Sequence, residues 1–254
     1  MSPHRAAGRS PGMKEHGKPA QWANEQKWKR RGGSAGHAAQ TVGAAIGAAV
    51  AMLAGLAAQP PARWLAVAAA LALVAVAAVT GSRAASLWTR ASQAAVGVRS
   101  EQQVRQVLRR AQPPVVCYGL VLGRGSGDCD VALATRGLGA VVIEVKTGYG
   151  QVRARNETLW AGRKALPRDP VGQARSQARL LSQALTAELG RPVEATAVVC
   201  LPGMTNAPFV TRGVYVCSAA DLPGVLHRVP GQFATVREAE RAFDRLWARQ
   251  SSRT

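Results

Sequence analysis

Two long uncharged runs of apolar residues in the first third of the chain constrain its folding most. The first covers residues 41–58 and the second residues 64–80. A helix of either length approaches the ~30 Å thickness of a hydrocarbon core at about 1.5 Å per residue. Neither run has the polar face that a soluble amphipathic helix requires. We therefore expect a two-helix transmembrane hairpin over residues 41–80, with an Ala-rich soluble hairpin as the alternative.

Basic residues flank the two runs on their outer sides. Eight Lys and Arg precede residue 41 and three follow in residues 81–100, whereas the loop between the runs holds only Arg63. The positive-inside rule then predicts that both termini and the C-terminal domain lie in the cytoplasm, at the inner face of the cell membrane. Residues 1–40, rich in Gly, Pro and basic side chains, are expected to form a flexible tail, and residues 81–96 a linker.

The charge balance of the chain points to an anionic partner. There are 33 Lys and Arg against 14 Asp and Glu, a net charge of +19. Such an excess favours binding to anionic lipid or to nucleic acid and does not choose between them. The cysteines lack the spacing of a zinc site or a disulfide framework, so we expect them to be small core residues in a reducing compartment. They are Cys117, Cys129, Cys200 and Cys217.

Residues 97–254 alternate between helical and strand patterns, which is typical of an α/β domain. A helix is expected over residues 100–110, with Ser100 as its N-cap and Pro113 beyond its end. A second, long helix is expected after Asp169, which we interpret as a cap or turn residue, because Pro170 suits a first helical position. Strands are expected at residues 115–122, 131–135, 140–147, 151–154 (continuing toward Trp160), 195–201 and 214–218, and a last helix at residues 235–249.

Three charged side chains are expected to meet on one hairpin. Residues 136–138 form a three-residue turn containing Gly, so residue numbers directly opposite each other sum to 274. Asp130 then faces Glu144, and Lys146 lies on the same face because side chains alternate along a strand. Opposed carboxylates are unfavourable unless something offsets them, and a hard divalent cation with oxygen ligands would do so.

Simpler interpretations of this hairpin stay open. Glu144 and Lys146 could be a solvent-facing ion pair at the end of a strand, and a register slip of one residue would separate the two acids. Asp128 lies two residues before Asp130 on the same strand face and is an alternative to it. The apolar run that begins at Val131 favours Asp130.

The charged hairpin, together with two residues from the flanking helices, resembles a known family. The residues that carry the likeness are Glu101, Asp130, Glu144, Lys146 and Gln173. They lie in the segments Gly97–Glu101, Asp128–Leu133, Gly139–Thr147, Gly150–Val152 and Asp169–Ala174. This pattern resembles the nuclease-related domain (NERD), a branch of the PD-(D/E)XK nuclease-like superfamily. The likeness covers roughly residues 97–189. Ser100 stands where the family often has Gly, and Asp169 where it often has Asn, and neither change removes a ligand.

The resemblance implies a restriction-endonuclease-like fold, with a central mixed sheet flanked by helices. It also implies that Asp130 and Glu144 hold Mg²⁺, or Mn²⁺, while Lys146 orients or activates the attacking water. Glu101 and Gln173 would complete the pocket from the two flanking helices. The expected activity is metal-dependent hydrolysis of DNA phosphodiester bonds. The alternative is a catalytically inactive module that binds DNA or a protein partner at the membrane.

Basic residues after the hairpin are candidates for contacts with DNA. A solvated basic face is an equal alternative for them. Trp160 could stack on a base, although an isolated Trp between strands is more often a core residue, and we expect it in the core. The candidate nucleic-acid-binding residues are Arg153, Arg155, Arg163, Lys164, Arg175 and Arg179.

Overall fold

The computed structural model describes residues 13–17, 39–53, 62–123, 128–147 and 149–252. It divides into two compact units, one of residues 20–98 and the other of residues 1–19 together with 99–254. Most of the tail expected over residues 1–40 lies outside the described residues. Its expected flexibility therefore stays a prediction.

The unit of residues 20–98 contains two helices packed side by side. These are the helix Ala39–Leu53 and the first part of α2 (Ala62–Ala111). Small residues lie between them: Ala44, Ala48 and Ala70 are buried, and Gly47 lies against Leu73. Large apolar side chains point outward instead, and Trp64 and Leu65 are each 74% exposed. Small residues inside and large apolar residues outside are typical of helices packed in lipid.

The expectation of two transmembrane spans is not supported. Among the described helices, only one stretch of α2, Val67–Ser86, is long and apolar enough to cross a membrane. The described part of the other helix, Ala39–Leu53, covers 15 residues, or about 22 Å, which is less than the ~30 Å of a hydrocarbon core. A single crossing would put the two ends of the chain on opposite sides, so the expected placement of both termini in the cytoplasm loses that basis.

The helix start expected at Ser100 is wrong, and the segment expected as a linker is helical. α2 continues without interruption through residues 81–96 and ends at Ala111. Ser100 is therefore a residue inside a helix and not its N-cap. The physical reason is the composition of residues 81–98, which is mostly Ala, Ser, Arg and Gln without a Pro, and which lets a helix propagate from its apolar part.

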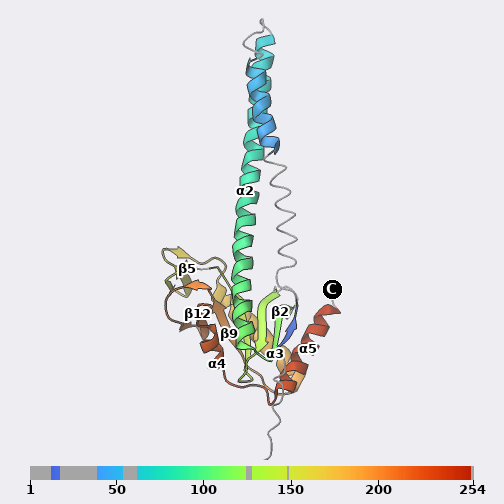
Figure 1. Ribbon diagram of the computed structural model, residues 1–254, viewed down its shortest axis with the longest axis vertical. Helices are drawn as coiled ribbons and strands as arrows, with labels where there is room; N and C mark the ends of the chain where they lie inside the picture. Colours follow the sequence, from blue (N-terminus) through green and yellow to red (C-terminus); the bar gives the residue numbers. More distant parts are fainter. Residues whose placement is uncertain (1–12, 18–38, 54–61, 124–127, 148, 253–254) are drawn as a thin grey trace, which may run out of the picture. The chain divides into compact units, whose positions relative to one another are not determined.

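The second unit is built on a seven-stranded mixed sheet in the order β1-β2-β3-β4-β9-β12-β11 (Figure 1). β2, β3 and β4 form an antiparallel meander, β9 and β12 continue parallel to β4, and β1 pairs parallel with β2 at the edge. The strands are β1 (Lys14–His16), β2 (Val115–Val121), β3 (Asp128–Ala134), β4 (Ala140–Val145), β9 (Ala195–Cys200), β11 (Phe209–Thr211) and β12 (Val214–Cys217). The predicted α/β class is confirmed.

Helices cover both faces of this sheet. α3 (Pro170–Leu189) and α5 (Val236–Ser251) pack on one face through a core that includes Leu181 and Phe243. The last turns of α2 and the short α4 (Leu222–His227) pack on the other face through Leu108 and Leu222. All four cysteines are buried and free, as expected. As predicted, Asp169 caps α3, since its side chain accepts a hydrogen bond from Gly172 N.

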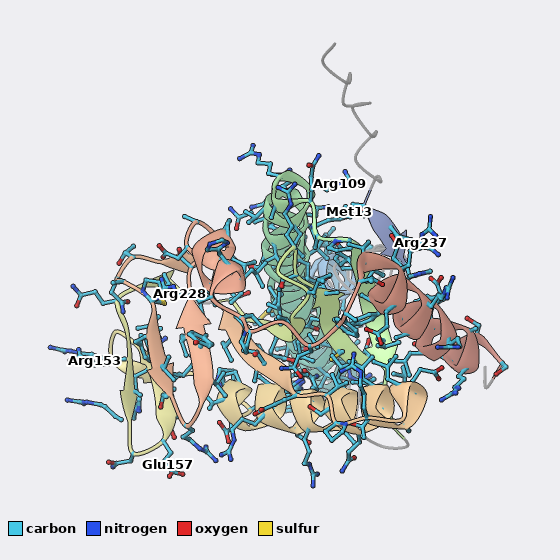
Figure 2. The ribbon with its side chains drawn as sticks, turned by 90° about the horizontal axis from the view of Figure 1, so that it is seen from below. Met13, Arg109, Arg153, Glu157, Arg228 and Arg237 are labelled. Atoms are coloured by element: carbon cyan, nitrogen blue, oxygen red, sulfur yellow. The ribbon has the colours of Figure 1, made fainter. Side chains whose placement is uncertain are left out.

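The strand expected from residue 151 toward Trp160 is two strands joined by a tight turn. β6 (Val152–Arg155) and β7 (Thr158–Ala161) pair antiparallel, and β8 (Lys164–Ala165) adds a third strand. Asn156 and Glu157 both take positive φ values at the turn, which no Gly or Pro signals in the sequence. In Figure 2, Glu157 lies at the tip of this hairpin and Arg153 extends outward from it. β5 (Tyr149–Gly150) pairs with β10 (Gly203–Met204) nearby.

The edge strand β1 was not predicted, because its three residues carry no apolar pattern. Charged contacts hold it instead. Glu15 forms ion pairs with Arg105 and Arg109 of α2, and Asp244 of α5 pairs with the residues on either side of Glu15. His16 also stacks on Trp247 of α5, with ring centroids 5.8 Å apart. A short segment from the start of the chain therefore completes the sheet of the C-terminal domain.

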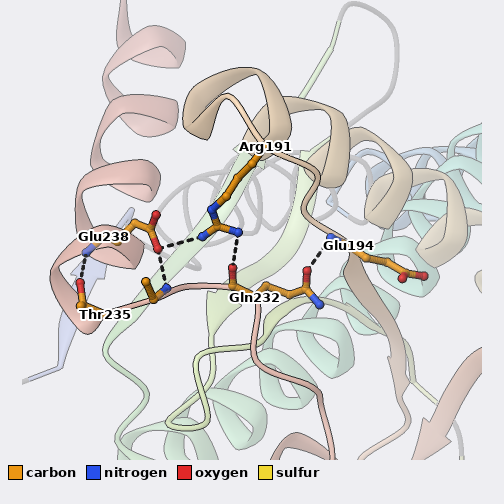
Figure 3. Close-up of polar contacts among 6 residues, drawn as sticks. Arg191, Glu194, Gln232, Thr235 and Glu238 are labelled. Carbon is orange, nitrogen blue, oxygen red and sulfur yellow. Dashed lines mark hydrogen bonds and ion pairs between the residues drawn. The ribbon is translucent and has the colours of Figure 1, made fainter.

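A polar network fixes the start of α5. Thr235 is the N-cap and accepts a hydrogen bond from Glu238 N at 3.1 Å. The Glu238 carboxylate accepts in turn from Ala234 N and from Arg191, which also donates to the carbonyl of Gln232 (Figure 3). This capping arrangement ties the first turn of α5 to the segment that follows α3.

Candidate active site

Glu144 is a fully buried carboxylate near the end of the central strand β4. Its exposed fraction is 0%, although Glu is among the residues least often buried. Burial, followed by the charge of Asp130, raises the pKa of Glu144 to about 7, against the opposing effect of Lys146 and Gln177. The fold therefore holds this side chain where its ionised form is disfavoured.

The ladder of β3 and β4 has the register from which Asp130 is predicted to face Glu144. The observed pairs Val131↔Ile143 and Ala132↔Val142 both sum to 274, and the next step of the same register pairs Asp130 with Glu144. The Asp130 carboxylate accepts a hydrogen bond from Val145 N at 2.7 Å. Burial raises the pKa of Asp130, and this hydrogen bond and Lys146 oppose the effect.

Lys146 shares the face of Glu144, as the alternation of side chains predicts. Its Nζ forms an ion pair with Glu144 Oε1, and its backbone N–H donates to Cys200 O of the neighbouring strand at 3.0 Å. The side chain of Lys146 is 28% exposed, whereas Glu144 is not exposed at all. The interpretation of Glu144 and Lys146 as an ion pair is therefore correct, but only the lysine faces solvent.

Glu101 brings a third carboxylate to this end of the sheet, from α2 on the opposite helical layer. Burial, then the charges of Asp130 and Asp128, raise the pKa of Glu101 to about 7, while Lys146 lowers it. Of the two aspartates on β3, only Asp130 contributes to the raised pKa of Glu144. The geometry therefore favours Asp130 over Asp128 as the partner of Glu144.

Gln177 is a site residue that the sequence analysis missed. It is only 2% exposed, its Nε2 donates to Asp128 O at 3.2 Å, and its carboxamide lies close enough to Glu144 to lower the pKa of that acid. Its Oε1 is buried without a hydrogen-bond partner. Gln173 lies one turn earlier on the same face of α3 and is partly buried. The available signal was a polar residue on the apolar face of the predicted helix.

The basic candidates are spread over three places. Arg153 and Arg155 project from β6, and Arg163 and Lys164 lie at the turn before β8 and on β8 itself. Arg175 and Arg179 line a groove beside α3 with Arg212. At 100° per residue both lie about 160° around α3 from Gln177, so they face away from the carboxylates. The structure does not gather these six residues beside the acidic hairpin.

The donors at this site suit a hard divalent cation. Asp130 and Glu144 offer carboxylate oxygens, burial raises the pKa of both acids despite the neighbouring Lys146, and Gln177 adds a buried carbonyl oxygen. Within the described residues, no three His, Cys, Asp or Glu side chains are grouped closely enough to hold a metal ion by themselves. The remaining ligands of a bound cation would have to be water or substrate oxygens, as is usual for Mg²⁺.

Comparison with known proteins supports the family indicated by the sequence. Residues 96–202 match the family model described as NERD: Nuclease-related domain. The match runs from the last part of α2 through β9, so it includes every residue of the carboxylate cluster, and it leaves α4 and α5 outside. No curated protein and no solved structure matches the chain.

Proposed function

We propose that this protein, whose residues 96–202 match the nuclease-related domain, hydrolyses DNA phosphodiester bonds with the help of Mg²⁺ or Mn²⁺. The observation that carries the proposal is the fully buried carboxylate of Glu144, with the partly buried Asp130 and with Lys146 beside it. We take the sheet to be the restriction-endonuclease-like core of the PD-(D/E)XK superfamily.

Each residue would have a distinct role. Asp130 and Glu144 would hold the metal ion, which when bound would offset charge on the scissile phosphate and lower the pKa of water. Lys146, anchored on Glu144 but reaching solvent, would orient the attacking water or the phosphate as a compact cation. Glu101, whose pKa is raised to about 7, would accept or hold a proton near neutral pH. Gln177 would fix the Glu144 carboxylate in place.

Cleavage of plasmid DNA by the detergent-solubilised full chain tests the proposal. Cleavage should need Mg²⁺ or Mn²⁺ and should be lost in Asp130→Asn, Glu144→Gln and Lys146→Met. Glu194→Gln is the matched control, because Glu194 is an exposed carboxylate of the same domain that lies outside the cluster. If the unaltered chain leaves DNA uncut but retards it on a gel, the alternative of a non-catalytic DNA-binding module replaces the enzyme.

We also propose that residues 39–98 attach the protein to a lipid bilayer and that both ends of this segment stay on the same side. Outward-facing apolar side chains such as Trp64 and Leu65 support the attachment, since water does not favour so much exposed apolar surface. The parallel pairing of β1 with β2 supports the same-side topology. A single crossing between residues 17 and 99 would put those two strands on opposite faces of the membrane.

Two single-cysteine labels test this topology. Ser10→Cys and Ser252→Cys, in a full chain whose four native cysteines are buried, should both react with a membrane-impermeant maleimide from the same side of sealed vesicles. The protein should also stay with the membrane during carbonate extraction. Labelling from opposite sides, or release into the supernatant, would contradict the proposal.

A further inference from the structure

The small sheet β6-β7-β8 has one apolar face and one face of different chemistry. Val152 and Leu159 are buried in the core of the domain. Their neighbours along the strands must point the other way, because side chains alternate with a period of two. That other face carries Arg153, Arg155 and Trp160.

The strand register sets these side chains next to one another. Arg153 lies directly opposite Trp160, and Trp160 lies directly opposite Ala165 on the third strand. Trp160 is therefore flanked by an arginine on one neighbouring strand and by the small Ala165 on the other. Trp160 is partly exposed and belongs to neither apolar core cluster, so the expectation that it is a core residue is wrong.

A hollow opens beside this tryptophan at the turn of the hairpin. Its volume is about 540 Å³, and it is lined by Ala154, Arg155, Asn156, Thr158 and Trp160. The one acid of this turn, Glu157, is ion-paired with Arg212. Arg153 extends away from the sheet into the surroundings (Figure 2). Next to the hollow there is thus an aromatic ring, positive charge and an amide, with little opposing negative charge.

We propose that this face binds an unpaired stretch of nucleic acid, with one base stacked on Trp160 and the flanking phosphates paired with Arg153 and Arg155. Bases inside a duplex are already stacked on each other, whereas an unpaired base can offer its π face to an aromatic side chain. Paired arginines contribute sequence-independent phosphate contacts. The inference rests on the proposed nuclease function and gives it a substrate class, single-stranded nucleic acid.

The face lies close to the carboxylates along the chain. β6 begins six residues after Lys146, so the Cα atom of Arg153 lies within about 25 Å of that of Lys146. Asn206 holds the start of β6 by accepting from Val152 N at 2.7 Å and donating to Val152 O at 3.0 Å. A strand stacked on Trp160 could therefore extend to the site where the metal and Lys146 act.

Binding measurements without cleavage test this face directly. The detergent-solubilised full chain is titrated, in EDTA, against a short fluorescein-labelled oligo(dT) strand and against a duplex of the same length, with anisotropy as the readout. The variants are Trp160→Leu, which keeps apolar volume but loses the aromatic face, Trp160→Phe, which keeps an aromatic face, and Arg153→Ala. Arg237→Ala is the matched control, an exposed arginine on α5 at the opposite side of Figure 2.

Trp160→Leu should weaken binding of the single strand about tenfold and leave duplex binding unchanged, and Trp160→Phe should restore most of the loss. Arg153→Ala should weaken binding of both probes and reduce its salt dependence by about one phosphate contact. Arg237→Ala should change neither. The inference is overturned if Trp160→Leu binds the single strand as tightly as the unaltered chain, or if it loses both probes equally.

These outcomes are separate from those of the nuclease test. A chain that cleaves DNA but binds the single strand equally well with Trp160→Leu would keep the proposed function and lose the stacking face. A chain that leaves DNA uncut, yet loses single-strand binding with Trp160→Leu, would keep the stacking face and lose the nuclease.

Discussion

The acids at the end of β4 and the acids at the rim of the domain are held in opposite ways. Burial raises the pKa of Glu144 and of Glu101, each to about 7. At the rim, burial is the largest single effect and raises the pKa of Glu15 and Asp244, but their Arg, Lys and His partners together outweigh it, and the net pKa of each is lowered. For Glu238 the hydrogen bond from Ala234 N, followed by Arg191, lowers the pKa.

The difference separates acids that stabilise the fold from acids that the fold must accommodate. Each rim acid has an arginine, lysine or histidine within ion-pairing distance, so ionisation strengthens the native state. The acids near the end of β4, which are Glu144, Asp130 and Glu101, have a single lysine among them, Lys146. The native state loses stability when they ionise. Acids whose ionised form is disfavoured in the native state are candidates for function, because a bound cation would stabilise their negative charge.

The sharpest way to break this comparison is to neutralise one acid of each kind. Glu144→Gln should lower DNA cleavage at least about 100-fold while leaving the free energy of unfolding at pH 7.5 unchanged or higher. Glu238→Gln should keep near-normal cleavage but lower that free energy by about 1 kcal/mol, because it removes a helix-capping contact. Plasmid cleavage and urea unfolding of the solubilised full chain measure both. Equal losses of stability in the two variants would erase the distinction.

The pH dependence of stability should differ between the two groups of acids. Because the pKa of Glu144 is raised above its unfolded value, its protonated form favours the native state, and stability should fall as pH rises from about 4.5 to about 7. The part of the fall due to Glu144 alone should amount to no more than about 3 kcal/mol. Glu144→Gln should reduce this limb and leave the part that Glu101 contributes.

The rim acids should produce the opposite limb. Their lowered pKa values mean that stability falls as pH drops below the ordinary values, 4.5 for Glu15 and Glu238 and 3.8 for Asp244. Asp244→Asn should reduce this limb without changing the limb at higher pH. Urea unfolding as a function of pH measures both limbs. A rise in stability of the unaltered chain between pH 5 and 7 would contradict the assignment of Glu144 and Glu101.

Gln177 offers a finer test of the carboxylate cluster. Gln177→Leu should lower cleavage about tenfold and move the rise of activity with pH to higher pH, because Glu144 loses a neighbour that lowers its pKa. Gln173→Leu, one turn away on the same helix, is the control and should move the pH profile less. A larger shift of the pH profile with Gln173→Leu would instead assign Gln173 to the catalytic pocket, as the family resemblance implies.

The smallest expected effect concerns β1. Asp244→Asn removes the partner of both Lys14 and His16, and these contacts are largely exposed. The free energy of unfolding at pH 7 should therefore fall by less than about 1 kcal/mol, and less still in high salt. A loss of several kcal/mol would contradict this expectation and would show that the stability of the domain depends strongly on β1.

The parts of the fold that follow from local periodicity could be predicted from the sequence. The meander, the register of β3 with β4 and the cap of α3 each depend on residues within one short segment. The long course of α2 and the turn at Asn156 could not, because they depend on helix propagation and on a left-handed backbone that no Gly marks. β1 depends on partners that lie about 90 to 230 residues away in the sequence.

In the site, sequence reasoning found the pair Asp130 and Glu144 because a hairpin fixes which residues face each other. It chose Gln173 from the family pattern and overlooked Gln177, although both lie on the same face of α3. Only packing shows which of two glutamines one turn apart reaches a buried carboxylate. The basic residues were gathered from sequence proximity alone, and the helix α3 turns Arg175 and Arg179 away from the acids.

The docking of β1 has a practical consequence for how this domain can be handled. A fragment beginning near residue 97 would lack the strand that covers β2, and it would expose a row of unpaired backbone N–H and C=O groups. It would also leave Arg105 and Arg109 without Glu15. Such truncated preparations should self-associate through their open edge, and supplying residues 13–17 as a separate peptide should suppress that tendency.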